Sequence, residues 1–160
     1  MIEALQDWES GRIQWIHIGD GPLLNEIIQL AKEKLSNNKL VSYSFLGHLD
    51  NKEVHEVMKN ESIDVFVNMS QSEGVPISIM EAMSVGIPII APSIFGIPEL
   101  VDENCGILFE STKGVSGLRN SIELFDKLSS EQRCAMGKAA YNTWKDRFCL
   151  EDNLSLLLQV

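Results

Sequence analysis

Basic residues, cysteines and long apolar runs are all scarce in this sequence of 160 residues. Lysine and arginine number 13 against 23 acidic residues, which gives a formal net charge of −10. That balance argues against a surface that binds nucleic acid, because such surfaces cluster basic side chains. The three cysteines, Cys105, Cys134 and Cys149, lack metal-binding or redox spacing. We therefore expect reduced thiols in a cytoplasmic protein.

No apolar run approaches the ~20 residues that a membrane-spanning helix needs. The acidic start, Met1-Ile2-Glu3, is unlike the basic start of a signal peptide. No two histidines have the spacing of metal ligands, and we expect neither a metal nor a cofactor apart from the substrate. What is present is an ordinary globular composition, 44% hydrophobic and 22% charged, in a chain long enough for one domain with a sizeable core.

Apolar, β-type runs alternate with helical stretches along the whole chain. This alternation predicts an α/β fold, a Rossmann-like parallel sheet with helices on both faces in residues 1–110, followed by C-terminal helices in 111–160. In the helix expected at 22–35, the predicted buried stripe is Leu23, Ile27, Leu30 and Ala31. The expected strands are 13–18, 41–46, 63–68, 86–91 and 105–109, and the other expected helices are 2–9, 51–60, 76–85, 112–128, 130–148 and 150–158.

The most informative stretch is 72–83, Ser-Glu-Gly-Val-Pro-Ile-Ser-Ile-Met-Glu-Ala-Met, which lies between two apolar runs. Together with these two runs, it predicts the succession strand, tight loop, helix and strand. Proline suits the first position of a helix and glycine its end, so we expect the helix to begin at Pro76 and to end at Gly86. Glu73 then lies in the loop and Glu81 lies inside the helix.

Between these two acids lie backbone amides that have no partner within the helix, those of Gly74, Val75, Ile77 and Ser78. Such amides form an anion site, so the order is carboxylate, anion site, carboxylate. A nucleotide-diphosphate sugar presents the matching order of sugar hydroxyls, diphosphate and ribose hydroxyls. Spacing alone leaves open that Glu81 is a solvated helix residue and that Glu73 only stabilises the helix dipole.

Gly21 and Gly47 also follow predicted strands, and ligands of parallel sheets bind outside the carboxyl ends of the strands. Gly19-x-Gly21 is a fragment of the dinucleotide fingerprint, but Leu24 stands where that fingerprint has its third small residue. This departure argues against binding of NAD or FAD.

The segment from Ser72 to Pro88 closely resembles the donor-site motif of GT-B glycosyltransferases, in the retaining group called family four. The resemblance covers about residues 2–125 and implies the C-terminal, donor-binding half of such an enzyme. It also implies that the first strand of that half, with a following Arg and Lys, is absent. Four further motifs occur in the family's order: Trp15–Pro22, Phe45–Gly47, Ile97–Val101 and Gly106–Phe109.

The resemblance assigns roles to individual residues. Glu73 would be the catalytic residue and would hold the hydroxyls of the transferred sugar, and Glu81 would hold the ribose. The base would lie against the segment after the strand at 41–46. Many relatives have a Gly-Gly pair where Phe95-Gly96 stands here, and Phe95 would either narrow the donor cleft or cover an apolar edge. The donor-binding residues would be Glu73, Gly74, Val75, Pro76, Ile77, Ser78 and Glu81, and the nucleotide-edge candidates are Gly21, Leu46, Gly47 and His48.

The implied function is transfer of a sugar from a UDP- or GDP-sugar to a glycan or lipid-linked acceptor, in bacterial surface polysaccharide synthesis. The partner would be an N-terminal acceptor domain that we expect to be missing here, and the full-length enzyme could contact a membrane peripherally. Two alternatives stay open. The chain could be a truncated, inactive module that binds nucleotide weakly, or Glu73 and Glu81 could be the acid pair of a glycoside hydrolase.

Overall fold

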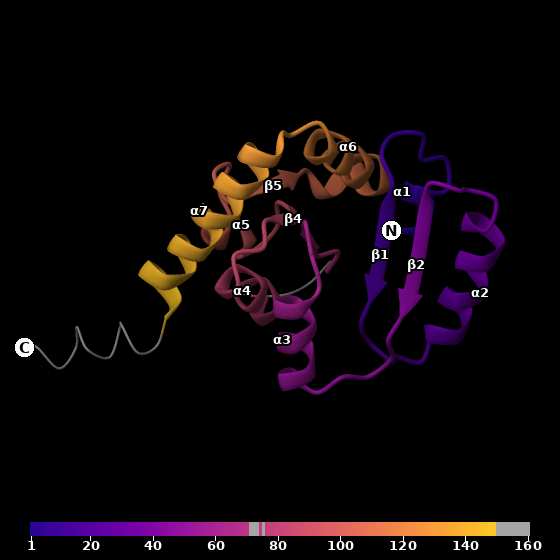
Figure 1. The fold of residues 1–160 in the computed structure, drawn as a ribbon, viewed down its shortest axis with the longest axis horizontal. Helices are drawn as coiled ribbons and strands as arrows, with labels where there is room; N and C mark the ends of the chain where they lie inside the picture. Colours follow the sequence, from indigo (N-terminus) through magenta and orange to yellow (C-terminus); the bar gives the residue numbers. More distant parts are fainter. Residues whose placement is uncertain (71–73, 75, 150–160) are drawn as a thin grey trace, which may run out of the picture. The chain divides into compact units, whose positions relative to one another are not determined.

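The computed structural model describes residues 1–70, 74 and 76–149. It divides after Asn60 into two compact units, residues 1–60 and 61–160 of the chain (Figure 1). The sequence predicted a single parallel sheet over residues 1–110. The described strands are all parallel, as predicted, but they form two hydrogen-bonded sheets, β1–β2 in the first unit and β3–β4–β5 in the second.

The first unit is built on a parallel strand pair. Ile13 of β1 lies opposite Val41 of β2, and His17 lies opposite Phe45. The predicted helix and strand positions are confirmed here, although the first helix is shorter than the expected 2–9. The elements are α1 (Ile2–Leu5), β1 (Ile13–His17), α2 (Leu24–Leu35), β2 (Val41–Phe45) and α3 (Asn51–Asn60).

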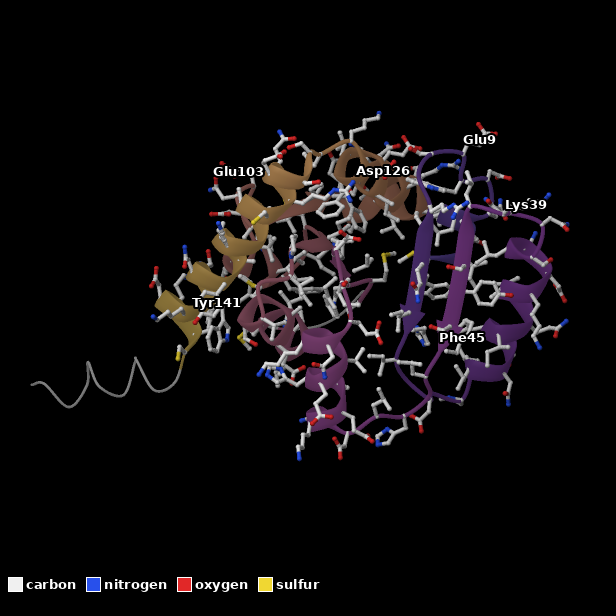
Figure 2. All side chains as sticks on the ribbon, viewed as in Figure 1. Glu9, Lys39, Phe45, Glu103, Asp126 and Tyr141 are labelled. Atoms are coloured by element: carbon white, nitrogen blue, oxygen red, sulfur yellow. The ribbon has the colours of Figure 1, made fainter. Side chains whose placement is uncertain are left out.

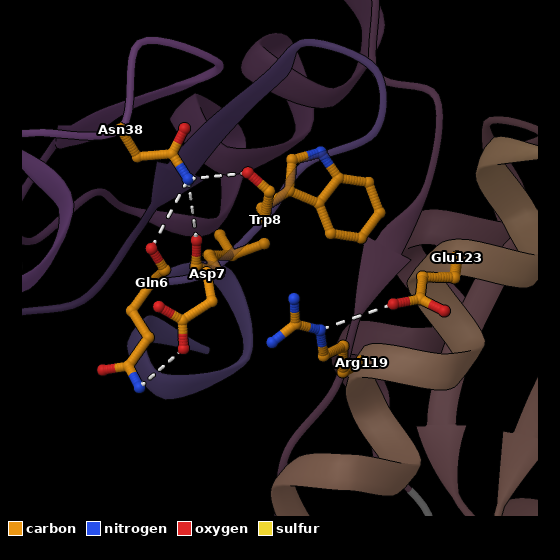
Figure 3. Close-up of polar contacts among 7 residues, drawn as sticks. Gln6, Asp7, Trp8, Asn38, Arg119 and Glu123 are labelled. Carbon is orange, nitrogen blue, oxygen red and sulfur yellow. Dashed lines mark hydrogen bonds and ion pairs between the residues drawn. The ribbon is translucent and has the colours of Figure 1, made fainter.

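The N-terminal segment is held down by buried apolar side chains and by one amide. Leu5 and Trp8 are 1% and 3% exposed. The Asn38 side-chain nitrogen donates to the carbonyl oxygen of Trp8 at 2.9 Å and also lies 3.5 Å from that of Gln6 (Figure 3). This amide satisfies backbone carbonyls that no regular secondary structure serves.

One part of the predicted core of this unit was wrong. Ala31 is fully buried and Ile27 is half-buried, but Leu23 and Leu30 are 57% and 38% exposed. Leu35, one turn beyond Ala31, is buried instead. The helical stripe is therefore real, but its buried part lies nearer the C-terminal end of α2.

The second unit carries a three-stranded parallel sheet in the order β3–β4–β5. The central strand is fully buried at Ile89, Ile90 and Ala91, as expected for a parallel strand covered on both faces. The elements are β3 (Phe66–Val67), α4 (Ile77–Ser84), β4 (Ile89–Pro92), α5 (Ile97–Leu100), β5 (Gly106–Phe109), a 3₁₀ turn (Ser111–Lys113), α6 (Gly114–Asp126) and α7 (Ser130–Phe148).

Two end signals in this unit match the sequence. Helix α7 begins with a capping box, in which the Ser129 hydroxyl accepts from the Gln132 amide and the Gln132 side chain accepts from the Ser129 amide. After α4, the amides of Gly86 and Ile87 donate to the carbonyls of Met83 and Ala82, and Gly86 adopts a φ of 77°. This is a Schellman motif, and its left-handed position favours glycine. The helix predicted at 150–158 lies outside the described residues.

Helices α4 and α7 approach closely at a pair of glycines. A Cβ on Gly137 would lie 2.4 Å from the carbonyl oxygen of Gly86, so only glycine fits at this crossing.

The polar surface of α6 carries an ion pair between Arg119 and Glu123 at 3.4 Å, one turn apart (Figure 3).

Candidate functional site

In the first unit, the carboxyl ends of β1 and β2 are tied together by backbone hydrogen bonds. The Leu46 amide donates to the carbonyl of His17 at 2.9 Å, and the Gly19 amide donates to the carbonyl of Gly47 at 2.8 Å. The loop that contains Gly21 therefore starts beside the segment of Leu46, Gly47 and His48. The four nucleotide-edge candidates thus share one edge of this strand pair.

Polar side chains also meet at this edge. The His48 Nδ1 atom lies 3.7 Å from a carboxylate oxygen of Asp20, and both side chains are mostly exposed. Gly47 has a φ of 70°, a left-handed conformation that favours glycine. The role of Leu46, Gly47 and His48 in holding a base stays a prediction.

In the second unit, the start of α4 presents backbone amides that have no partner among the described residues. Pro76 is the N-cap residue, with an extended backbone and no side chain that caps the helix. The amides of Gly74, Ile77 and Ser78 donate to no carbonyl or side chain of the described residues. The helix begins one residue later than predicted, since Pro76 precedes the first helical residue. Glu73 and Val75 lie outside the described residues.

Glu81 lies on the face of α4 that also carries the side chains of Ile77 and Ser78. It follows Ile77 by four residues and Ser78 by three, so the three side chains lie along the same side of the helix. Ile77 is 67% exposed, whereas Ile79, Ala82 and Met83 on the opposite side are fully buried. Glu81 itself is half-buried and has no hydrogen bond or ion pair from its carboxylate to another described residue. This carboxylate is therefore available to a ligand that reaches the start of α4.

Two neighbouring loops define the surroundings of this helix start. Asn68, at the carboxyl end of β3, is 7% exposed, and its side-chain oxygen accepts from the Ser70 amide at 2.9 Å. The Gly96 amide, in the loop between β4 and α5, donates to the carbonyl of Gly74 at 3.1 Å. Asn68 was not among the predicted site residues, although an asparagine directly after a strand often makes such a turn.

A groove of about 730 Å³ lies elsewhere in the second unit. Asp64 and Pro88, which line it, come before β3 and β4, so the groove lies at the amino end of these strands. Its other walls come from the C-terminal end of α4 and from α7, which contributes Arg133 and Tyr141. Tyr141 is labelled in Figure 2. Ligands of parallel sheets bind at the carboxyl ends, so this groove is distinct from the start of α4.

Within the described ranges, no three side chains among histidine, cysteine, aspartate and glutamate gather closely enough to hold a metal ion. The same part of the chain contains no helix with the length and apolarity needed to cross a bilayer.

Cys105 is buried, and burial raises the pKa of its thiol to about 11. This thiol is a packing group and not a nucleophile.

Comparison with known proteins identifies the family. The model of the family described as glycosyl transferases group 1 matches residues 1–143, and the chain belongs to this family. The predicted resemblance to GT-B glycosyltransferases is thereby confirmed, together with the α/β class.

Two curated relatives show the extent of the similarity. The chain is 33% identical over 141 residues to N-acetyl-alpha-D-glucosaminyl L-malate synthase of Bacillus anthracis. This alignment covers 86% of the chain and 34% of that protein. It is 36% identical over 130 residues to sulfoquinovosyl transferase SQD2 of Arabidopsis thaliana. This second alignment covers 77% of the chain and 23% of that protein. The chain thus spans between about a quarter and a third of these relatives.

Solved structures show the same fold at lower identity. TarM of S. aureus, whose crystal structure contains UDP, aligns with a TM-score of 0.77 at 18% identity, over 99% of the chain and 31% of that protein. Anabaena Alr3699/HepE, in complex with UDP and glucose, aligns with a TM-score of 0.73 at 21% identity, over 99% of the chain and 43% of that protein.

Proposed function

We propose that this chain binds the nucleotide-diphosphate sugar of a glycosyltransferase at the start of α4. The observation that carries the proposal is the combination of the amides of Gly74, Ile77 and Ser78, which have no partner among the described residues, with the carboxylate of Glu81 further along α4. Amides at a helix start favour phosphate oxygens, and a carboxylate accepts hydrogen bonds from paired hydroxyls. Together they suit a diphosphate followed by a ribose.

In the proposed reaction the amides stabilise the negative charge that develops on the leaving diphosphate. Glu81 positions the nucleotide through its ribose, which fixes the diphosphate over the helix start. Glu73 is the proposed partner of the transferred sugar, on the strength of the family resemblance alone. UDP or GDP is the proposed carrier, and the UDP in the TarM and HepE structures supports the first of these.

The full-length protein would transfer the sugar to a glycan or lipid-linked acceptor supplied by a second domain, in the cytoplasm. Relatives such as the O-antigen biosynthesis glycosyltransferase WclY of Escherichia coli, 27% identical over 139 residues, support a role in surface polysaccharide synthesis. For the 160-residue chain alone, the proposed measurable activity is donor binding.

The proposal is tested by calorimetric titration of the chain with UDP, GDP and ADP. The Glu81→Gln variant removes the charge and keeps the shape of the side chain. Because a hydrogen bond to a charged group contributes about 1.5–3 kcal/mol, we expect this variant to bind the preferred nucleotide about 10- to 100-fold more weakly.

Glu103→Gln is the matched control, because Glu103 is exposed, lies in a turn of the same unit and loses the same charge (Figure 2). It should keep the wild-type affinity. Equal affinities for Glu81→Gln and wild type would remove Glu81 from the site. Absence of nucleotide binding by the wild-type chain would overturn the proposed function.

A further inference from the structure

Phe95 combines a strained backbone with an exposed aromatic ring. It has a φ of 45° and is the one residue other than glycine with a positive φ in the described part of the chain. For a bulky side chain this conformation is a genuine outlier, and such strain concentrates at functional sites. The side chain is 68% exposed, so burial of the ring does not offset the strain.

The loop around Phe95 is fixed by its neighbours. On one side, the Ser93 amide donates to the carbonyl of Phe109 at 2.7 Å. On the other side, the Gly96 amide donates to the carbonyl of Gly74, and the next residue, Ile97, is fully buried. The backbone on both sides of Phe95 is therefore anchored, and this fixes the place in the loop from which the exposed side chain starts.

Its position is the edge of the sheet that carries the proposed donor site. Phe95 follows β4, and Gly96 is bonded to Gly74, two residues before Pro76 and the start of α4. Met69, just after β3, and Ile77, the first residue of α4, are also exposed, by 39% and 67%. Three exposed apolar side chains thus accompany the polar groups of this site, a mixture typical of small-molecule sites.

We propose that Phe95 is a stacking platform for the pyranose ring of the donor and helps to set which sugar is accepted. The face of a phenyl ring carries partial negative charge, and one face of a pyranose presents C–H groups with partial positive charge. The phosphates and the ribose engage the amides and Glu81, so an apolar platform beside Gly74 serves the sugar portion. This inference rests on the proposed function and adds the group that reads the sugar.

The test compares nucleotides with nucleotide sugars on the whole chain. Affinities are measured for UDP, UDP-glucose, UDP-galactose, UDP-N-acetylglucosamine, GDP and GDP-mannose, with wild type, Phe95→Ala and Phe95→Tyr. We expect Phe95→Ala to weaken binding of the preferred nucleotide sugar by about two- to tenfold, the range of an aromatic stacking contact. Binding of the free nucleotide should not change, and Phe95→Tyr should keep the wild-type ratio.

Two further variants separate stacking from folding. Leu124→Ala removes an apolar side chain that is 56% exposed on α6, and it should leave every affinity unchanged. Phe95→Gly relieves the left-handed strain, so it should melt no lower than wild type and yet lose the sugar preference.

The outcomes for the two proposals are distinct. If wild type binds no nucleotide, the donor site itself is wrong and this inference is lost with it. If wild type binds nucleotide but Phe95→Ala keeps the same ratio between nucleotide sugar and nucleotide, only the stacking role is overturned. If Phe95→Ala weakens the free nucleotide equally, Phe95 contacts the nucleotide and not the sugar, which also overturns the role.

Discussion

At the scale of single residues, His17 gives the first unit a dependence on pH. Its ring, on β1, packs beside those of Trp15 and Phe45, with centroids 5.8 and 5.4 Å away. Phe45 is labelled in Figure 2. Burial lowers the pKa of His17 below its ordinary value of 6.5. The unfolded chain therefore takes up a proton at His17 at a pH where the folded chain does not.

We expect the free energy of unfolding to fall as the pH drops through 6.5 toward the lowered folded pKa of His17. The His17 contribution is absent above this window because the residue is neutral in both states. Urea denaturation between about pH 7.5 and pH 5.5, above the range where carboxylates titrate, measures the slope. His17→Gln should flatten it, and an unchanged slope would contradict the assignment.

Residue-level predictions from the helical period were confirmed in part. Ala31 is fully buried, as the period of the helix expected at 22–35 predicted. The predicted burial of Leu23 and Leu30 was wrong for a physical reason. A helical period says which residues share a face, but not how far a neighbouring element covers that face. Phe95 shows the same limit, because its backbone conformation depends on anchors at Phe109 and Gly74.

At the scale of elements, the crossing of α4 and α7 depends on Gly137. We expect Gly137→Ala to lower the free energy of unfolding by about 1–3 kcal/mol, because the new Cβ would collide with the carbonyl oxygen of Gly86. This loss exceeds the gain of about 1 kcal/mol that alanine brings to a helix interior.

Chemical denaturation measures this change, with Lys138→Ala as the control on the same helix. Lys138 is exposed, and its substitution should alter the free energy of unfolding by no more than about 0.5 kcal/mol. A Gly137→Ala protein as stable as the control would show that the two helices can separate without cost.

Start and stop signals explain most of the element boundaries. Ser129 and Gly86 are local signals, and α7 and α4 begin and end as those residues predict. β3 is shorter than the apolar run 63–68, since only Phe66 and Val67 pair with β4. The residue before β4 is Pro88, which has no amide to donate to the chain before Phe66. The length of β3 is therefore limited by its neighbouring strand and not by the apolar run itself.

At the scale of the whole molecule, the alternation of strands and helices predicted the fold class but not the pairing of the strands. Each parallel pair is linked through a helix, as in β1–α2–β2 and β3–α4–β4. Which pairs become neighbours depends on contacts between residues far apart in sequence. The site was predicted through its motif, and Glu73, its proposed catalytic residue, lies outside the described residues.

Binding of a diphosphate at the start of α4 can be located by amide chemical shifts. UDP is added stepwise to the ¹⁵N-labelled chain while the backbone amides are followed by NMR. We expect the amides of Gly74, Ile77 and Ser78 to shift most, because they donate to the phosphate oxygens. If the largest shifts instead surround Arg133 and Lys138 in the groove beside α7, binding at the start of α4 is contradicted.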